Sequence, residues 1–264
     1  MEFRLIDHHQ HELLESCRRI AETNYLDNHV LLGDLHSPCM DLTRHYGLFN
    51  SNNQLVSFFV IFDGFTLPSV VLPVKMVKSI FHQKMDFLLT ILPQEFIILS
   101  LELLEKDLSD FVEINRCAKD NCMITNNKNN LSSSDYPFLK KARKDDYDRI
   151  DSFYKKFEHN PWNPIQLKSN FYHFIEVENE IVACGGTHFE TPNLAQLGNI
   201  FVLEEHRRKG YGSILTSAIT RAVLSKKEYA TLFVYHENYP AKALYKKLGF
   251  KLHKPARLFF CEKK

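Results

Sequence analysis

The sequence predicts an α/β protein made of two related domains, each built around a mixed sheet. Three observations carry this prediction. The length of 264 residues suits one large domain or two of ordinary size. A seam rich in asparagine and serine lies in the middle of the chain, and the same order of helices and strands is predicted on both sides of it. With 44% hydrophobic and 25% charged residues, the chain can bury a substantial core.

The N-terminal half reads as a helix, a hairpin, a short strand and a second helix. Apolar periodicity predicts a helix over 11–26. Two runs rich in strand-forming residues, 45–50 and 55–64, flank the turn SNNQ and predict a hairpin. A strand at 68–74 and a helix at 75–92 complete this half.

The seam spans residues 121–134, NCMITNNKNNLSSS, where polar residues displace the apolar ones and no periodicity survives. We therefore predict a first domain at 1–125, a linker at 126–135 and a second domain at 136–264.

The C-terminal half repeats the order of the first half and then continues. Its predicted elements are a helix at 145–157, a hairpin at 171–177 and 181–190, a strand at 196–203, a helix at 211–227, a strand at 230–237, a helix at 240–248, and strands at 250–253 and 256–262. Gln54 and Glu180 stand in equivalent turns, 180 − 54 = 126 residues apart, and His45 and Phe171 have the same offset. A duplicated unit explains this match, although two unrelated α/β domains can share a hairpin by chance. Strands that alternate with helices imply a parallel pair, and ligands bind at the carboxyl ends of such strands.

Composition excludes several functional classes. The 33 Lys and Arg residues against 32 Asp and Glu residues leave a net charge of +1, so no overall field favours nucleic acid or an anionic membrane. The chain has neither a leader-like start nor about 20 consecutive apolar residues, which predicts a cytoplasmic protein without a membrane partner. The six cysteines lack paired CxxC spacing and are expected to be reduced and mostly buried. We expect no metal, and the His8, His9 and His11 cluster to be solvated.

The most informative stretch is EEHRRKGYGS, residues 204–213, between a predicted strand and a predicted helix. Unpaired N–H groups and the helix dipole make such a helix start an anion site. Gly210 and Gly212 let the backbone approach a phosphate, the cations at 207–209 supply charge, and Ser213 supplies a hydroxyl. The spacing matches neither GxxxxGK[ST] nor GxGxxG, and taken alone the stretch could be a plain surface turn.

Two motifs together resemble the GNAT superfamily of acetyl-CoA-dependent N-acetyltransferases. The first is R-x-x-G-x-G from Arg207 to Gly212, and the second is VYHENYPAKALYKKLGF, residues 234–250. The resemblance covers roughly 136–264. It implies a GNAT fold there, acetyl-CoA as co-substrate and an amine as acceptor. The first half, which lacks the glycine pair and the tyrosine, reads as a degenerate domain of the same kind.

The resemblance also implies roles for particular residues. Tyr245 is the implied general acid, which protonates the departing thiolate; its alternative reading is a core tyrosine. Asn238 is an implied cofactor contact, although it could equally cap the helix that begins near Pro240. The implied cofactor-binding residues are Phe201, Val202, Leu203, Arg208, Lys209, Gly210, Tyr211, Gly212, Ser213 and Asn238.

The general base departs from the family pattern. Many relatives carry a carboxylate on the strand before the phosphate turn, but residues 195–200 read AQLGNI. His188 and Glu190 are substitutes, and Glu158 or His159 could act through a water molecule.

We therefore expect an acetyltransferase that acts on a primary amine by direct attack. The alternative is a protein that binds acyl-CoA as a sensor or scaffold without turnover. The acceptor, the acyl chain length and the oligomeric state are left open by the sequence.

Overall fold

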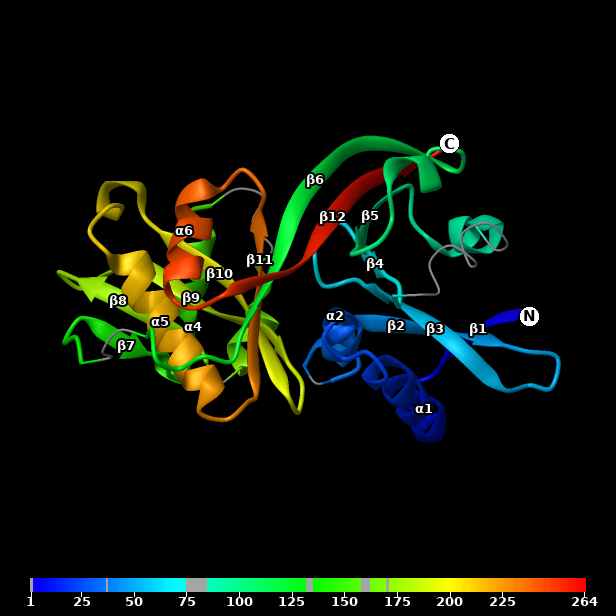
Figure 1. Ribbon diagram of the computed structural model, residues 1–264, viewed down its shortest axis with the longest axis horizontal. Coiled ribbons are helices and arrows are strands. Elements are labelled where there is room, and N and C mark those ends of the chain that lie inside the picture. The colour runs from blue at the N-terminus through cyan, green and yellow to red at the C-terminus, as the bar shows by residue number, and fades with distance from the viewer. Residues whose placement is uncertain (1, 37, 75–84, 132–134, 158–161, 170) are drawn as a thin grey trace. The chain divides into compact units, whose positions relative to one another are not determined.

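The computed structural model describes residues 2–36, 38–74, 85–131, 135–157, 162–169 and 171–264. The chain divides into two compact units (Figure 1). Unit 1 contains Met1–Asp120 and Pro255–Lys264, and unit 2 contains Asn121–Lys254. The first part of the chain, up to the seam, forms β1 (Glu2–Ile6), α1 (His11–Glu22), α2 (His29–Asp34), η1 (Cys39–Leu42), β2 (Thr43–Phe49), β3 (Leu55–Phe62), β4 (Ser69–Val71), β5 (Glu95–Ser100), η2 (Glu105–Asp107) and β6 (Val112–Thr125).

The second part of the chain has a related order of helices and strands. Its elements are β7 (Leu139–Lys141), η3 (Lys144–Asp146), α4 (Tyr147–Tyr154), η4 (Pro164–Lys168), β8 (His173–Val177), β9 (Glu180–Glu190), β10 (Leu194–Val202), η5 (Glu204–His206), α5 (Tyr211–Leu224), β11 (Tyr229–Tyr235), α6 (Tyr239–Lys247) and β12 (Lys251–Lys263). The mixed α/β class predicted from the sequence is confirmed.

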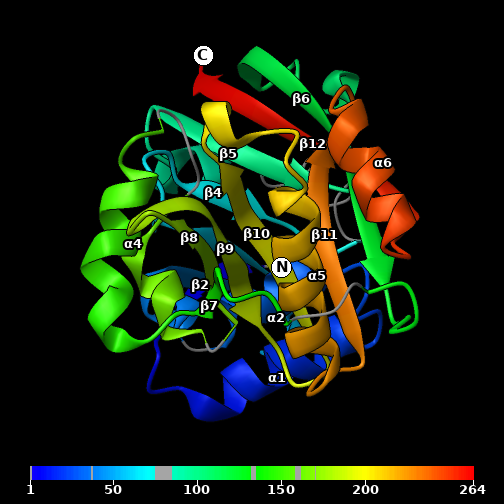
Figure 2. The same cartoon turned by 90° about the vertical axis from the view of Figure 1, so that its left-hand side faces the viewer.

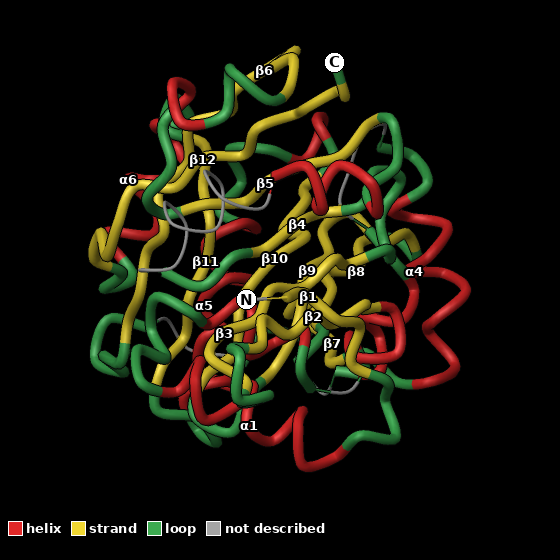
Figure 3. The backbone as a smooth tube through the Cα atoms, turned by 90° about the vertical axis from the view of Figure 1, so that its right-hand side faces the viewer, coloured by secondary structure: helices red, strands yellow, loops and turns green. Residues whose placement is uncertain are grey.

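Unit 1 is a mixed sheet in which β1, β2 and β3 lie side by side (Figure 3) and the order continues through β4, β5 and β12 to β6. The pairs β1–β2, β2–β3, β3–β4 and β5–β12 are antiparallel, and the pair β4–β5 is parallel. Strand β3 shows why the sheet is covered on both faces. Phe58 and Val60 enter the cluster beneath α1 and α2, whereas Phe59 and Ile61 enter the cluster on the other face. Because side chains alternate along a strand, the run FFVI can be buried only between two layers.

The last strand of the chain completes the sheet of unit 1. Residues Arg257 to Glu262 of β12 pair antiparallel with β5, and Phe259 and Cys261 belong to the unit 1 core. The expected second domain ran to residue 264, whereas 255–264 cluster with the first unit. The two strands expected at 250–253 and 256–262 form one strand through Pro255. Pro255 lies before the first residue that pairs with β5, so its missing N–H removes no bond from that pairing.

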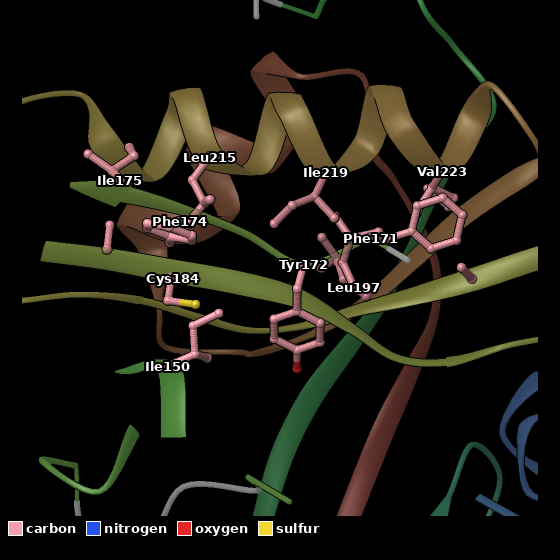
Figure 4. Close-up of a cluster of buried hydrophobic side chains, with 14 of the residues drawn as sticks. Ile150, Phe171, Tyr172, Phe174, Ile175, Cys184, Leu197, Leu215, Ile219 and Val223 are labelled. Carbon is pink, nitrogen blue, oxygen red and sulfur yellow. The ribbon is translucent and has the colours of Figure 1, made fainter. Parts of the chain in front are cut away.

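Unit 2 has the strand order β7-β8-β9-β10-β11-β6, with antiparallel pairs from β7 to β10 and a parallel pair β10–β11. Helix α5 crosses one face of this sheet (Figure 2). Figure 4 shows Leu215, Ile219 and Val223 of α5 pointing at the strands, with Tyr172 and Ile150 on the opposite face. Segments α4 and η4 pack against β9, so α5 covers one face and α4 with η4 the other.

The hairpins of the two units share a detail of their turns. Asn53 has φ 59° and Asn179 has φ 66°, so both adopt the left-handed conformation that asparagine tolerates better than most residues. Their separation, 179 − 53 = 126, equals the offset found in the sequence. The repeat therefore extends to the backbone conformation of the turn.

Two predicted helices differ from the observed elements. Helix α1 ends at Glu22, short of the predicted 26, because polar side chains take over its last carbonyl groups. Thr23 Oγ1 donates to the carbonyl of Ile20 at 2.8 Å, and Asn28 Nδ2 donates to that of Ala21 at 3.1 Å. Of the helix predicted at 75–92, residues 85–91 are helical and 75–84 lie outside the described residues.

The six cysteines are free, and all but the half-buried Cys117 are buried, as expected. Within the described ranges, no helix has the length and apolarity to cross a membrane. The same ranges contain no cluster of three or more His, Cys, Asp or Glu side chains with the geometry of a metal site.

One buried acid makes the stability of unit 1 depend on pH. Burial raises the pKa of Asp34, at the end of α2, from 3.8 to about 8. A carboxyl group whose pKa rises on folding holds its proton more tightly in the folded state. Its contribution to the free energy of unfolding is therefore full at low pH and is lost as the pH rises toward 8, with a limiting slope of about 1.4 kcal/mol per pH unit.

Asp34→Asn, which mimics the protonated acid, is expected to gain at least about 1 kcal/mol relative to the wild type between pH 6.5 and pH 8. Urea denaturation at the two pH values measures this difference. Asp41→Asn, at an exposed position in η1, is the matched control and should leave the difference unchanged. An equal effect of Asp34→Asn at both pH values would contradict the assignment.

Candidate functional site

Strands β10 and β11 part at the carboxyl end of the parallel pair. Their pairing runs from Leu194 opposite Tyr229 to Leu197 opposite Leu232 and goes no further, although β10 continues to Val202 and β11 to Tyr235. The two strands therefore diverge beyond this point. This divergence leaves main-chain groups of β10 facing a gap instead of a neighbouring strand.

The register of β10 against β9 decides which groups face this gap. The N–H of Leu203 donates to the carbonyl of Val182 at 2.9 Å, so Leu203 is already bonded within the sheet. Bonded pairs recur at every second residue of an antiparallel ladder, which turns Phe201 toward β9 as well and Val202 away from it. Of the implied cofactor-binding residues Phe201, Val202 and Leu203, only Val202 therefore presents its main chain to the gap.

The glycine-containing turn after β10 presents a row of backbone donors. Arg208 has φ 62° and Gly210 has φ 83°, two left-handed residues separated by Lys209. The N–H groups of 208–212 have no hydrogen-bond acceptor among the described residues, and Gly210 caps α5 without a side-chain bond. Successive N–H groups in such a turn, at the positive end of a helix, form a concavity for an anion.

Side chains around this concavity add positive charge and leave room for a ligand. Arg208 and Lys209 are exposed, and Arg207 Nε donates to the carbonyl of Val202 at 3.3 Å. A Cβ at Gly210 would have no neighbour within 4 Å, and one at Gly212 would meet Val202 and Leu244 only at ordinary contact distance. Gly210 therefore allows the left-handed backbone conformation, and both glycines leave room for a ligand. Neither is required for close packing within the protein.

Helix α6 brings the second motif to the same end of the sheet. Asn238 caps this helix, with its Oδ1 accepting the N–H of Ala241 at 3.2 Å, so its expected capping role is confirmed. Tyr245 packs against the unit 2 core, with its ring 5.9 Å from that of Phe250. Burial raises the pKa of Tyr245 to about 12, which keeps its phenol protonated at neutral pH.

The candidate bases stand in different surroundings. Glu190 lies opposite Ala195, before the strands part, and contacts Ser169 and Lys227. His188 lies over Gly198, where an added Cβ would fall 1.9 Å from its Nε2. Burial lowers the pKa of His188 to about 4, so its imidazole is neutral at pH 7. Glu158 and His159 lie outside the described residues.

Sequence reasoning missed a buried polar network beside the gap. Tyr154 from α4, Gln166 from η4, and His188 and Asn199 from β9 and β10 are joined by hydrogen bonds. Gln166 Nε2 lies 2.8 Å from His188 Nδ1, and Asn199 Nδ2 donates to Gln166 Oε1 at 2.6 Å. The only signal in the sequence is the short motif GN, residues 198–199, inside an apolar strand, which is typical of an irregular strand.

Comparison with known proteins identifies the class of this site. The family model described as FR47-like protein matches residues 179–258, which include β10, the glycine turn, α5 and α6. An N-alpha-acetyltransferase of Saccharolobus solfataricus is 30% identical over 154 residues, which are 47% of this chain and 86% of that protein. The chain belongs to the GNAT superfamily of acetyltransferases.

Solved structures agree on the fold over nearly the whole chain. A GNAT-family acetyltransferase from Novosphingobium aromaticivorans has a TM-score of 0.63 at 18% identity, covering 88% of this chain and 96% of its own. One from Colwellia psychrerythraea has a TM-score of 0.62 at 15% identity and covers 100% of both chains. A tandem GNAT protein from the clavulanic acid biosynthesis pathway has a TM-score of 0.63 at 12% identity, covering 99% and 98%. The predicted arrangement of a GNAT domain preceded by a related domain fits these structures.

The backbone concavity leads to a binding prediction. Coenzyme A is expected to raise the melting temperature, and Gly210→Glu is expected to abolish that rise because a carboxylate would occupy the position of the anion. Asn193→Glu adds the same charge at an exposed turn before β10 and should keep the rise. Differential scanning fluorimetry at millimolar coenzyme A measures both.

Gly210→Ala separates backbone strain from occlusion. At φ 83° an alanine costs about 1 kcal/mol, so the unliganded melting temperature should fall while part of the coenzyme A response persists. An undiminished response in Gly210→Glu would contradict the assignment of this turn as the anion site.

Proposed function

We propose that the chain transfers the acetyl group of acetyl-CoA to a primary amine by direct attack and that unit 2 carries the reaction. The observation that carries this proposal is the row of unpaired N–H groups at 208–212 beside the parted ends of β10 and β11. In this assignment the pyrophosphate is held by the backbone from Arg208 to Ser213, and the pantetheine arm pairs with Val202. The amide nitrogen of Asn238, whose oxygen caps α6, contacts the same arm.

The proposed chemistry needs a donor for the leaving group. The nitrogen lone pair of the amine attacks the thioester carbon, negative charge develops on the carbonyl oxygen, and N–H groups facing the gap stabilise it. The carbon–sulfur bond then breaks, and the thiolate takes the proton of Tyr245 Oη while the surplus proton of the amine passes to solvent. Tyrosinate regains its proton from water. Burial raises the pKa of this phenol, but the same apolar surroundings raise the pKa of the departing thiol, so transfer between them remains feasible.

Two observations favour an α-amino group as the acceptor. The relative from Saccharolobus solfataricus is an N-alpha-acetyltransferase. At pH 7 roughly a tenth of an α-amine is neutral, against less than one part in a thousand of a lysine side chain. A site without a carboxylate at 195–200 suits an acceptor that supplies its own free base.

The acceptor is tested with a pair of peptides. A peptide with a free N-terminus and no lysine is expected to release coenzyme A thiol at least about tenfold faster at pH 7 than the same peptide with a blocked N-terminus and one lysine. Free amino acids form a third arm and distinguish a small α-amine from a peptide terminus. Tight binding of coenzyme A without thiol release from any of these amines would favour a sensor or scaffold.

Tyr245→Phe tests the acid. The turnover number at pH 7 is expected to fall about a hundredfold, with little change in coenzyme A affinity, because a positioned acid contributes a factor of this size. Tyr239→Phe, on the same helix and 65% exposed, is the control and should leave turnover unchanged. An unaltered rate in Tyr245→Phe would remove this residue from the mechanism and return it to the core.

A further inference from the structure

Strand β10 carries an irregularity beside the gap. The β9–β10 register shifts by one between Gly198 and Phe201, so Asn199 and Ile200 together stand opposite Gly185. Asn199 has φ 53° there, a left-handed conformation that is rare inside a strand. Such a bulge changes the direction of the main-chain groups that follow it.

Three buried side chains hold this bulge from the face covered by α4 and η4. Tyr154 Oη donates to the main-chain carbonyl of Asn199 at 2.7 Å. Asn199 Nδ2 donates to Gln166 Oε1 at 2.6 Å and to Tyr172 Oη at 3.3 Å. All four residues are at most 6% exposed, so these bonds are sheltered from water.

The hydroxyl of Tyr154 also fixes the next N–H group. The carbonyl of Asn199 and the N–H of Ile200 belong to one trans peptide plane and point in opposite directions. A carbonyl held toward Tyr154 therefore directs the N–H of Ile200 away from α4. Ile200 lies beyond Leu197, the last residue of β10 that pairs with β11, so this peptide borders the gap between the two strands.

We propose that Tyr154 and Asn199 are positioning residues that aim the Ile200 N–H at the carbonyl oxygen of the bound acyl thioester. The proposal rests on the proposed function for the identity of the thioester. Neither side chain touches the reacting atoms, and each acts through the peptide between Asn199 and Ile200. The left-handed conformation of Asn199 is the element that their hydrogen bonds maintain.

The first readout needs no acceptor and no turnover. Coenzyme A lacks the acyl carbonyl, so the ratio of its dissociation constant to that of acetyl-CoA reports the contact made by Ile200. Isothermal titration of the wild type should show acetyl-CoA binding about fivefold more tightly, the size of one hydrogen bond. In Tyr154→Phe the ratio should fall to within about twofold of unity, with the coenzyme A constant itself nearly unchanged.

Tyr147→Phe is the matched control. Tyr147 lies on the same helix, and its Oη donates to the carbonyl of Leu167 at 2.6 Å, so this variant loses the same kind of bond without touching the bulge. Its ligand ratio and turnover number should equal those of the wild type. If Tyr154→Phe behaves like Tyr147→Phe in both readouts, the network is only structural and the proposal is overturned.

Two variants of Asn199 distinguish loss of the positioning role from a general folding defect. Asn199→Gly tolerates positive φ and keeps the main-chain carbonyl for Tyr154, whereas Asn199→Ala opposes that conformation. Turnover should decrease in the order wild type, Asn199→Gly, Asn199→Ala, with the alanine variant at least about tenfold below wild type. Equal turnover of folded glycine and alanine variants would overturn the role of the left-handed conformation.

The two proposals fail in different ways. If the wild type transfers acetyl to no amine while Tyr154→Phe still loses its preference for acetyl-CoA, the proposed function fails and the positioning role stands. If the wild type transfers normally but has equal affinity for both ligands, the function stands and the positioning role is wrong.

Discussion

The site depends on one constraint, the divergence of two parallel strands at their carboxyl ends. Where β10 and β11 stop pairing, Val202 has a main-chain group directed away from β9 and without a neighbouring strand. A main-chain donor in that position needs another acceptor. The glycine turn adds a second row of such donors at the start of α5. An extended ligand with carbonyl groups and a diphosphate can satisfy both Val202 and the turn, which links the geometry of the sheet to the chemistry of the family.

Unit 1 has the same order of elements but lacks this divergence. Strand β4 has three residues, and all of them pair with β3 on one side and with β5 on the other. No β4 residue is left facing a gap. Residues Ser57 to Phe62 of β3 are buried, and the two core clusters of the unit lie on either face of this strand. The expectation that this half lacks a cofactor site therefore has backbone support in addition to the missing glycines.

The parts of the site that are local in sequence could be predicted. The glycine turn, the start of α5 and the cap at Asn238 depend on residues within a few positions of one another, and the structure has them as expected. The direction of Leu203 could not be predicted, because it depends on a bond to Val182, 21 residues earlier. The link from Tyr154 to Asn199 spans 45 residues, and no periodicity reports such a contact. The place of β12 was missed for the same reason, since strand pairing is non-local.

The position of β12 has a consequence for how the chain folds during synthesis. Unit 1 begins at the N-terminus, yet its sheet places Phe96 against Cys261, and its core contains Phe259. These partners emerge from the ribosome about 160 residues after the strand they join. Until β12 is translated, β5 therefore has an unpaired edge. Unpaired strand edges can form wrong pairs with other strands. We therefore expect the nascent chain to depend on chaperones during synthesis.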